Sequence, residues 1–154
     1  MDARLNPEAP PSPEHVATFR ADYRPPEWWV RTVALDVALD PAATRVRATL
    51  TAERNGAHVQ PLRLAGDGLT PLVVQVDGGD ASWRMEGDTL VVAIDGATAS
   101  VETEVEIAPE ANSELMGLYA SGGILCTQCE SEGFRRITFH PDRPDVLSIY
   151  SVRM

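Results

Sequence analysis

Alternation of apolar and polar side chains is the feature that most constrains the fold of this chain. Over residues 33–39 every second side chain is Val or Leu, and over residues 101–107 every second side chain is Val, Thr or Ile. The side chains between them are small or charged. Successive side chains of a strand point to opposite faces of a sheet, so this pattern is typical of strands with one buried face. No stretch has the spacing of a long helix. The sequence therefore predicts an all-β fold.

Several shorter strands are expected between and around these two, each bounded by Gly, Pro, Asn or Asp. They are predicted at residues 46–52, 62–64, 72–76, 83–85, 90–94 and 147–154. About seven short strands with turn signals roughly every ten residues are typical of an antiparallel sandwich or a curled, saddle-like sheet with little helix. Glu102, Glu104 and Glu106 share one face of their strand, and that face is predicted to meet solvent.

The length of 154 residues fits one domain with a core of its own. Residues 1–22 are rich in Pro, Ala and charge and are predicted to be an N-terminal arm, with one helical turn over residues 15–20. Residues 23–154 are predicted to be the β domain. The strand pattern runs to the last residue without a cap or a polar tail, so we expect the chain to be part of something longer.

Charge and hydropathy exclude two classes of partner. The formal net charge of -10 repels polyanions, so no nucleic-acid partner is expected. No window approaches the roughly 18 consecutive apolar residues of a membrane span, so no membrane partner is expected, and the first residues lack the order of a signal peptide. A cytoplasmic location, with reduced thiols, is the expectation that follows.

Cys126 and Cys129 form a CxxC motif, which raises the question of metal or redox chemistry. A structural zinc site needs four ligands in most cases, and the chain has neither a second CxxC nor a suitably spaced pair among His15, His58 and His140. The residues after the motif are a poor helix start, unlike a thioredoxin-like site. In an extended segment the two thiols would point to opposite faces. Inert, partly buried thiols are the favoured interpretation.

Gln128 and Glu130 are the candidate binding residues. In an extended segment they share one face, with Glu132 next along it. An amide oxygen beside a carboxylate can accept hydrogen bonds from a cation with several donors, such as a primary ammonium. Spacing alone favours the alternative, a structural ion pair between Glu130 and Arg135 or Arg136.

His140 and Asp142 lie two residues apart in a proline-rich turn. The pair is similar to part of a catalytic acid–base arrangement, but the sequence places no serine or cysteine nucleophile beside it. A loop histidine without a catalytic role is therefore the favoured interpretation.

Four motifs in order, with consistent gaps, give the chain a family resemblance. They are LMGLY, CTQCE, EGFRRIT and PDRPDV within residues 111–146, preceded by DYRPP at residues 22–26. With these motifs the chain resembles the end of the N-terminal β domain of the bacterial alanyl aminopeptidases (aminopeptidase N), zinc metallopeptidases of the gluzincin group. The resemblance covers residues 22–154.

The resemblance implies a full-length enzyme that removes N-terminal amino acids from peptides, with peptides bearing a free N-terminus and its own catalytic domain as partners. Its zinc would be held by an HExxH helix and a downstream glutamate in a following domain, beside a GAMEN motif. None of these motifs occurs here, so this chain alone is expected to bind no catalytic zinc and to be inactive. Gln128 and Glu130 match the family's pair that reaches the active site, where the glutamate holds the substrate's α-ammonium.

Two other functions remain open at this point. A stand-alone β-sandwich interaction module would need no enzyme, and it predicts a stop codon after Met154. A CxxC thiol or metal protein predicts about one zinc per chain or loss of thiols on mild oxidation. The resemblance further implies that late strands of the domain follow Met154, which would leave an unpaired sheet edge prone to pairing with another copy.

Overall fold

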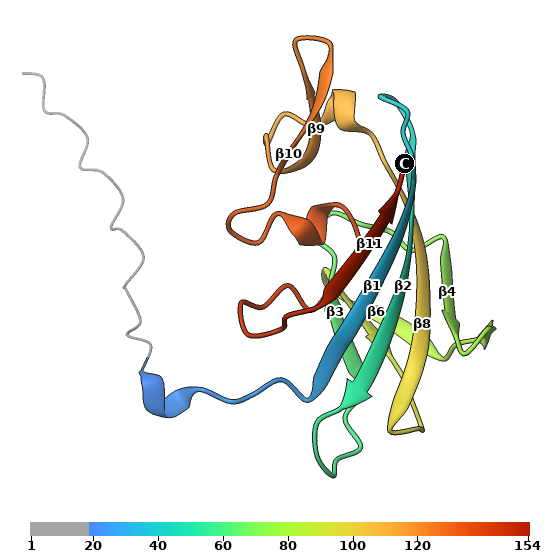
Figure 1. Cartoon of the computed structure of the whole chain (residues 1–154), viewed down its shortest axis with the longest axis vertical. Helices are drawn as coiled ribbons and strands as arrows, with labels where there is room; N and C mark the ends of the chain where they lie inside the picture. Colours follow the sequence, from blue (N-terminus) through green and yellow to red (C-terminus); the bar gives the residue numbers. More distant parts are fainter. Residues whose placement is uncertain (1–18) are drawn as a thin grey trace, which may run out of the picture.

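The computed structural model describes residues 19–154, which form eleven strands and three short 3-10 helices (Figure 1). The strands are β1 (Trp28–Ala38), β2 (Thr44–Arg54), β3 (Leu62–Ala65), β4 (Val73–Val76), β5 (Gly79–Asp80), β6 (Trp83–Glu86), β7 (Thr89–Val92), β8 (Thr98–Ile107), β9 (Gly117–Ser121), β10 (Ile124–Gln128) and β11 (Ile149–Arg153); the helices are η1 (Arg20–Asp22), η2 (Pro109–Ala111) and η3 (Phe134–Arg136). The predicted all-β fold is confirmed. The arm predicted over residues 1–22, with its helical turn, lies mostly outside the described residues.

The largest sheet has six strands in the order β11-β1-β2-β8-β4-β5. Its centre is an antiparallel meander in which Val33 of β1 lies opposite Leu50 of β2, and Leu50 lies opposite Val101 of β8. These three side chains are at most 1% exposed. The period-two pattern therefore puts one continuous apolar face on the inside of the sheet, as predicted.

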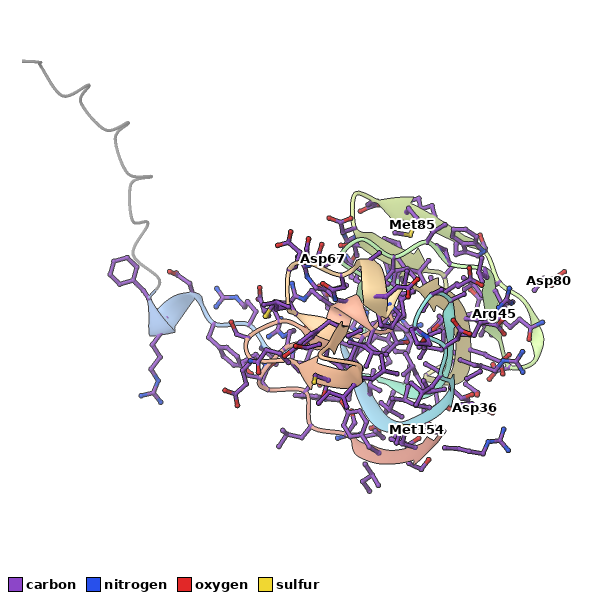
Figure 2. All side chains as sticks on the ribbon, turned by 90° about the horizontal axis from the view of Figure 1, so that it is seen from above. Asp36, Arg45, Asp67, Asp80, Met85 and Met154 are labelled. Atoms are coloured by element: carbon purple, nitrogen blue, oxygen red, sulfur yellow. The ribbon has the colours of Figure 1, made fainter. Side chains whose placement is uncertain are left out.

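The hydrophobic core lies between that inner face and a smaller sheet of order β3-β7-β6. Leu62, Leu64 and Leu90 of the smaller sheet are fully buried, and so is Phe139, which follows η3. Seen from above, side chains fill the space enclosed by the curved sheet, while Asp36 and Arg45 lie on its outer side (Figure 2). The strands predicted at residues 83–85 and 90–94 are confirmed as β6 and β7, which form an antiparallel hairpin.

The direction of β11 differs from the predicted antiparallel arrangement. β11 pairs with β1 in parallel, with Thr32 opposite Ile149, and Figure 1 shows the two strands side by side. The cause lies in the loop before β11. Arg143 donates to the carbonyl of Arg24 at 2.9 Å, and Ser148 Oγ donates to the carbonyl of Val30 at 2.6 Å. Because this loop is tied beside the start of β1, β11 begins there and runs in the same direction.

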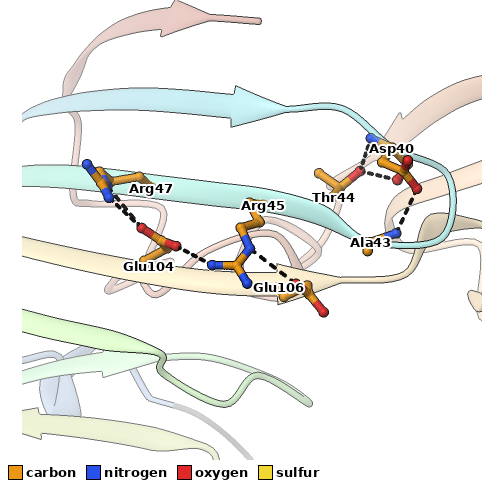
Figure 3. A network of polar contacts seen from close by, with 7 residues as sticks. All are labelled: Asp40, Ala43, Thr44, Arg45, Arg47, Glu104 and Glu106. Carbon is orange, nitrogen blue, oxygen red and sulfur yellow. Dashed lines mark hydrogen bonds and ion pairs between the residues drawn. The ribbon is translucent and has the colours of Figure 1, made fainter.

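The outer face of β8 departs from the prediction that its three glutamates meet solvent. Glu104 has a side chain only 11% exposed, and its carboxylate binds Arg45 at 2.9 Å and Arg47 at 2.7 Å (Figure 3). The register explains this contact, since Arg47 lies directly opposite Glu104 on β2. Hydrogen bonds from Arg47 and then Arg45 hold the pKa of Glu104 below its ordinary value. The prediction is wrong for Glu104, because the two arginine side chains cover it.

Candidate functional site

The candidate residues Gln128 and Glu130 lie where β10 ends in a tight turn. Gln128 is the last residue of β10 and lies opposite Gly117 of β9. The turn closes when the N–H of Gly133 donates to the carbonyl of Cys129 at 2.9 Å. Glu130 is exposed inside this turn. The extended geometry assumed from the sequence therefore stops at Gln128, one residue before Cys129.

A hydrogen bond, rather than strand alternation, joins the two candidate residues. The side-chain amide Nε2 of Gln128 donates to the main-chain carbonyl of Glu130 at 2.8 Å. That bond fixes the main chain at Glu130 and leaves the Oε1 atom of Gln128 and the Glu130 carboxylate as acceptors. A third group with several N–H donors could bind both.

Two glycines allow the close packing around this turn. A Cβ atom at Gly133 would lie 2.4 Å from the carbonyl oxygen of Gln128 and 2.7 Å from Cα of Cys129. Gly117 has φ +74°, and a Cβ there would lie 2.8 Å from Cβ of Arg136. Both contacts involve atoms that cannot move cheaply, so any larger residue would displace the turn.

The two arginines after the turn have partners other than Glu130. Arg135 binds Asp142 through Nε at 2.8 Å and Glu132 at 3.1 Å, and Arg136 binds Asp67 at 2.7 Å. Across residues 19–154 no ion pair includes Glu130. The alternative interpretation, a structural ion pair of Glu130 with either arginine, is therefore wrong.

Asp67 and Asp142 are the site residues that sequence reasoning did not assign. Asp142 lies in the turn that follows η3, only seven residues after Arg135, so the sequence indicates only weakly that the two residues are close. Asp67 is far from Arg136 along the chain, and nothing local marks it as a partner. A polar cavity of about 440 Å³ beside the turn is lined in part by Asp67, Ser131, Glu132 and both arginines.

His140 is a buried residue in the loop between η3 and β11. It is 3% exposed, and its main chain forms a bridge with Ala65. Its Nδ1 accepts a hydrogen bond from the N–H of Asp142 at 3.0 Å, and its ring packs edge-on against Phe134 at 5.2 Å. Burial lowers the pKa of His140 to about 4, against the opposing effect of the Asp142 carboxylate. The neutral ring is a structural acceptor, and its burial was not predicted from the sequence.

Both cysteines are free thiols and partly buried. Burial raises the pKa of the Cys129 thiol, and the Asp142 carboxylate raises it further, which disfavours the nucleophilic thiolate. In the part of the chain that the structure describes, no group of three or more His, Cys, Asp and Glu side chains could hold a metal ion. No described helix is long and apolar enough to cross a membrane.

Comparison with known proteins gives close relatives. The chain is 46% identical over 137 residues to aminopeptidase N of Caulobacter vibrioides and 41% identical over 139 residues to aminopeptidase N of Escherichia coli, matches that cover 87% and 90% of the chain. It spans only 16% of the length of either relative. No family model matches the chain.

A solved structure agrees with these relatives. The crystal structure of Legionella pneumophila aminopeptidase A in complex with aspartic acid matches 86% of the chain and 16% of its own, with a TM-score of 0.76 and 27% identity. The sequence comparison and the fold comparison thus agree, since both match this chain to a small part of much longer aminopeptidases. The chain belongs to the aminopeptidase N family and is its N-terminal β domain.

Proposed function

We propose that this domain serves a zinc aminopeptidase that removes N-terminal amino acids from peptides, and that Glu130 and Gln128 bind the substrate's α-ammonium group. The names of the relatives support the activity. The match of CTQCE to the family's motif supports the two residues. A stand-alone interaction module has no comparable support, since relatives carry the same domain within much longer chains.

One observation carries the proposal for Glu130. Its carboxylate is exposed on a fixed turn, and the two arginines best placed to neutralise it are occupied by Asp142, Glu132 and Asp67. A carboxylate with a fixed main chain and no cation partner is a ready acceptor for an ammonium. Once a catalytic domain covers the turn, the buried charge would be costly without that ammonium.

The role suits an exopeptidase, which must cut one residue from the chain end. A carboxylate that anchors the α-ammonium sets the distance from the chain end to the scissile peptide bond. A substrate held in this way has already lost translational and rotational entropy on binding, so less of that entropy is lost in reaching the transition state. Gln128 contributes by fixing the Glu130 main chain and by offering Oε1 as a second acceptor.

The remaining parts of the proposal concern zinc, docking and location. Zinc would polarise the scissile carbonyl from a separate catalytic domain of the longer chain. Exposed apolar side chains of Leu147, just before β11, and of Ile149 and Val152, within β11, offer that longer chain a surface to cover. The free thiols of Cys126 and Cys129 suit a reducing compartment, so we place the enzyme in the cytoplasm.

The test is Glu130→Gln in the full-length enzyme, with hydrolysis of L-alanine p-nitroanilide as the measurement. Loss of a hydrogen bond to a charged group is worth about 1.5–3 kcal/mol, so we expect kcat/KM to fall roughly 10- to 100-fold. The matched control is Glu114→Gln, another exposed glutamate without an arginine partner among residues 19–154. Wild-type kinetics in Glu130→Gln would end the anchoring proposal.

A second measurement tests where the activity resides. Zinc content and hydrolysis are compared between the 154-residue chain and the full-length enzyme. We expect zinc and activity only in the full-length enzyme. Stoichiometric zinc in the 154-residue chain would contradict the proposal and return attention to Cys126 and Cys129.

A further inference from the structure

The guanidinium group of Arg135 joins three pieces of chain behind the Glu130 turn. Its Nε donates to Oδ2 of Asp142 at 2.8 Å, and its Nη2 donates to the main-chain carbonyl of Asp142 at 3.1 Å. Nη2 also lies 3.1 Å from Oε1 of Glu132, a residue of the turn itself. The main-chain N–H of Arg135 adds a fourth contact, to Oδ2 of Asp142 at 3.2 Å. One side chain thus connects the turn, η3 and the loop at Asp142.

The turn is held at both ends, but by different means. At the first end, the pairing of Gln128 with Gly117 and the Gln128 side chain fix the chain up to Glu130. At the second end, Gly133 packs on the main chain of Gln128, and Arg135 holds Glu132. Glu130 has no ion pair of its own within residues 19–154. The place of its carboxylate is therefore set by these neighbours.

Burial and the surrounding contacts give the Arg135–Asp142 pair a firm geometry. The two side chains are only 23% and 17% exposed, so water screens the pair less than it screens a surface ion pair. Asp142 has φ 45°, a conformation that residues other than glycine rarely adopt. The bond from its N–H to Nδ1 of His140 holds it there. Buried His140 thus supports Asp142, which supports Arg135.

We propose that Arg135 is a positioning residue for Glu130, which keeps the Glu130 turn in the geometry that receives the substrate's α-ammonium. This inference rests on the proposed function of Glu130. Arg135 is anchored by Asp142, reaches the turn through Glu132, and has no contact with the Glu130 side chain among the ion pairs and hydrogen bonds of residues 19–154.

Arg136 is a natural comparison for this role. It is the next residue in the same 3-10 helix and is also half-buried, and it forms one ion pair, with Asp67 at 2.7 Å, where Arg135 forms two. That pair connects η3 to residue 67 and includes no residue of the 129–133 turn. A general requirement for arginine at this helix would therefore affect both positions, whereas a positioning role affects Arg135 alone.

The experiment measures KM and kcat for L-alanine p-nitroanilide in the full-length enzyme carrying Arg135→Gln, Arg135→Lys or Arg136→Gln. We expect Arg135→Gln to raise KM about tenfold, the scale of a misplaced hydrogen bond, with a smaller change in kcat. Arg135→Lys should recover part of the loss, because one ammonium can meet Asp142 but lacks the fork that also reaches Glu132. Arg136→Gln should change KM less than about twofold.

A double variant separates positioning from stability. If Arg135 acts through Glu130, Arg135→Gln should change KM less than about twofold when Glu130→Gln is already present. An equal tenfold rise in that background, or no rise in the wild-type background while Glu130→Gln has its effect, overturns the positioning role alone. Wild-type kinetics in Glu130→Gln would instead overturn the proposed function. If Arg135→Gln does not fold, Arg135→Lys and Asp142→Asn replace it, and their effects on KM are compared in the wild-type and Glu130→Gln backgrounds in the same way.

Discussion

The meander of β1, β2 and β8 and the segment of residues 126–145 achieve order in different ways. The meander repeats one simple rule, with apolar side chains such as Leu50 and Val101 inside and charged side chains outside. The later segment contains the end of β10, the 3-10 helix η3 and the isolated bridge of His140 to Ala65. Beside the buried side chains of Ile137 and Phe139, its order depends on single polar contacts between residues such as Arg135 and Asp142.

This difference separates stability from the proposed binding function within one domain. Apolar burial is non-directional and is summed over many side chains, so the meander can keep its fold when one of these side chains is changed. A turn such as residues 129–133 depends on a few directed hydrogen bonds, each of which sets an orientation. The candidate binding residue, Glu130, lies in this hydrogen-bonded turn, and the turn itself rests on the apolar sheet.

The largest expected effect belongs to the meander. Leu50→Ala removes a fully buried side chain from β2 and should lower the free energy of unfolding by about 4 kcal/mol. Thr49→Ala, on the outer face of the same strand, is the control and should change it by less than about 0.5 kcal/mol. Urea unfolding of the chain measures both. Equal losses from the two variants would show that apolar burial does not dominate the sheet.

The next effect belongs to the later segment and depends on pH. The pKa of His140 is lowered by burial from 6.5 to about 4, so between these values the unfolded chain binds a proton that the folded chain does not. Stability from this group is complete above pH 6.5 and is lost as pH falls toward 4. From pH 7 to pH 4.5 the loss should be about 2–3 kcal/mol at roughly 1.4 kcal/mol per pH unit.

His140→Gln isolates that contribution, because an amide can accept the bond from Asp142 and does not titrate. Its stability should change much less between pH 7 and pH 4.5. The pKa of Asp145 is lowered to about 2, chiefly by Arg143, so its contribution is lost only below about pH 4, outside this window. An identical pH slope in the variant and the wild-type chain would mean that residue 140 is not the titrating group.

The smallest effect concerns the polar face of the meander. Glu104→Gln weakens the contacts of Glu104 with Arg45 and Arg47, whose side chains are more than half exposed. Water and salt therefore screen the network, and the loss should be about 1 kcal/mol, with a smaller loss at 1 M NaCl. Urea unfolding at two salt concentrations checks this. If Glu104→Gln lowered the free energy of unfolding more than Leu50→Ala does, the stability of the meander would depend on polar contacts, as the order of residues 126–145 does.

The sequence permits prediction of most strands but only part of the site. Strands such as β2 and β8 follow from a local period, which needs no knowledge of partners. The direction of β11 depends on contacts of Arg143 and Ser148 with distant residues, and no local pattern encodes it. The contacts of Arg136 with Asp67 depend on tertiary structure in the same way.

For the site, residue type and motif identified Gln128 and Glu130 as candidates, and their role stays a prediction. The geometry that joins them was not predictable, because the assumed strand ends at Gln128. The burial of His140 was not predictable for a related reason. Two prolines and two aspartates near it are typical of an exposed turn, yet the main-chain bridge to Ala65 draws the residue into the core.

The parallel pairing of β11 with β1 has a consequence during synthesis. Asp36 and Arg153, paired across these strands, are 117 positions apart. At about 5–20 residues per second, a ribosome needs roughly 6–23 s between them. Throughout that interval β1 can pair with β2, but its other edge presents free N–H and C=O groups. A nascent chain of this domain should therefore benefit from a chaperone that covers β1 until translation delivers β11.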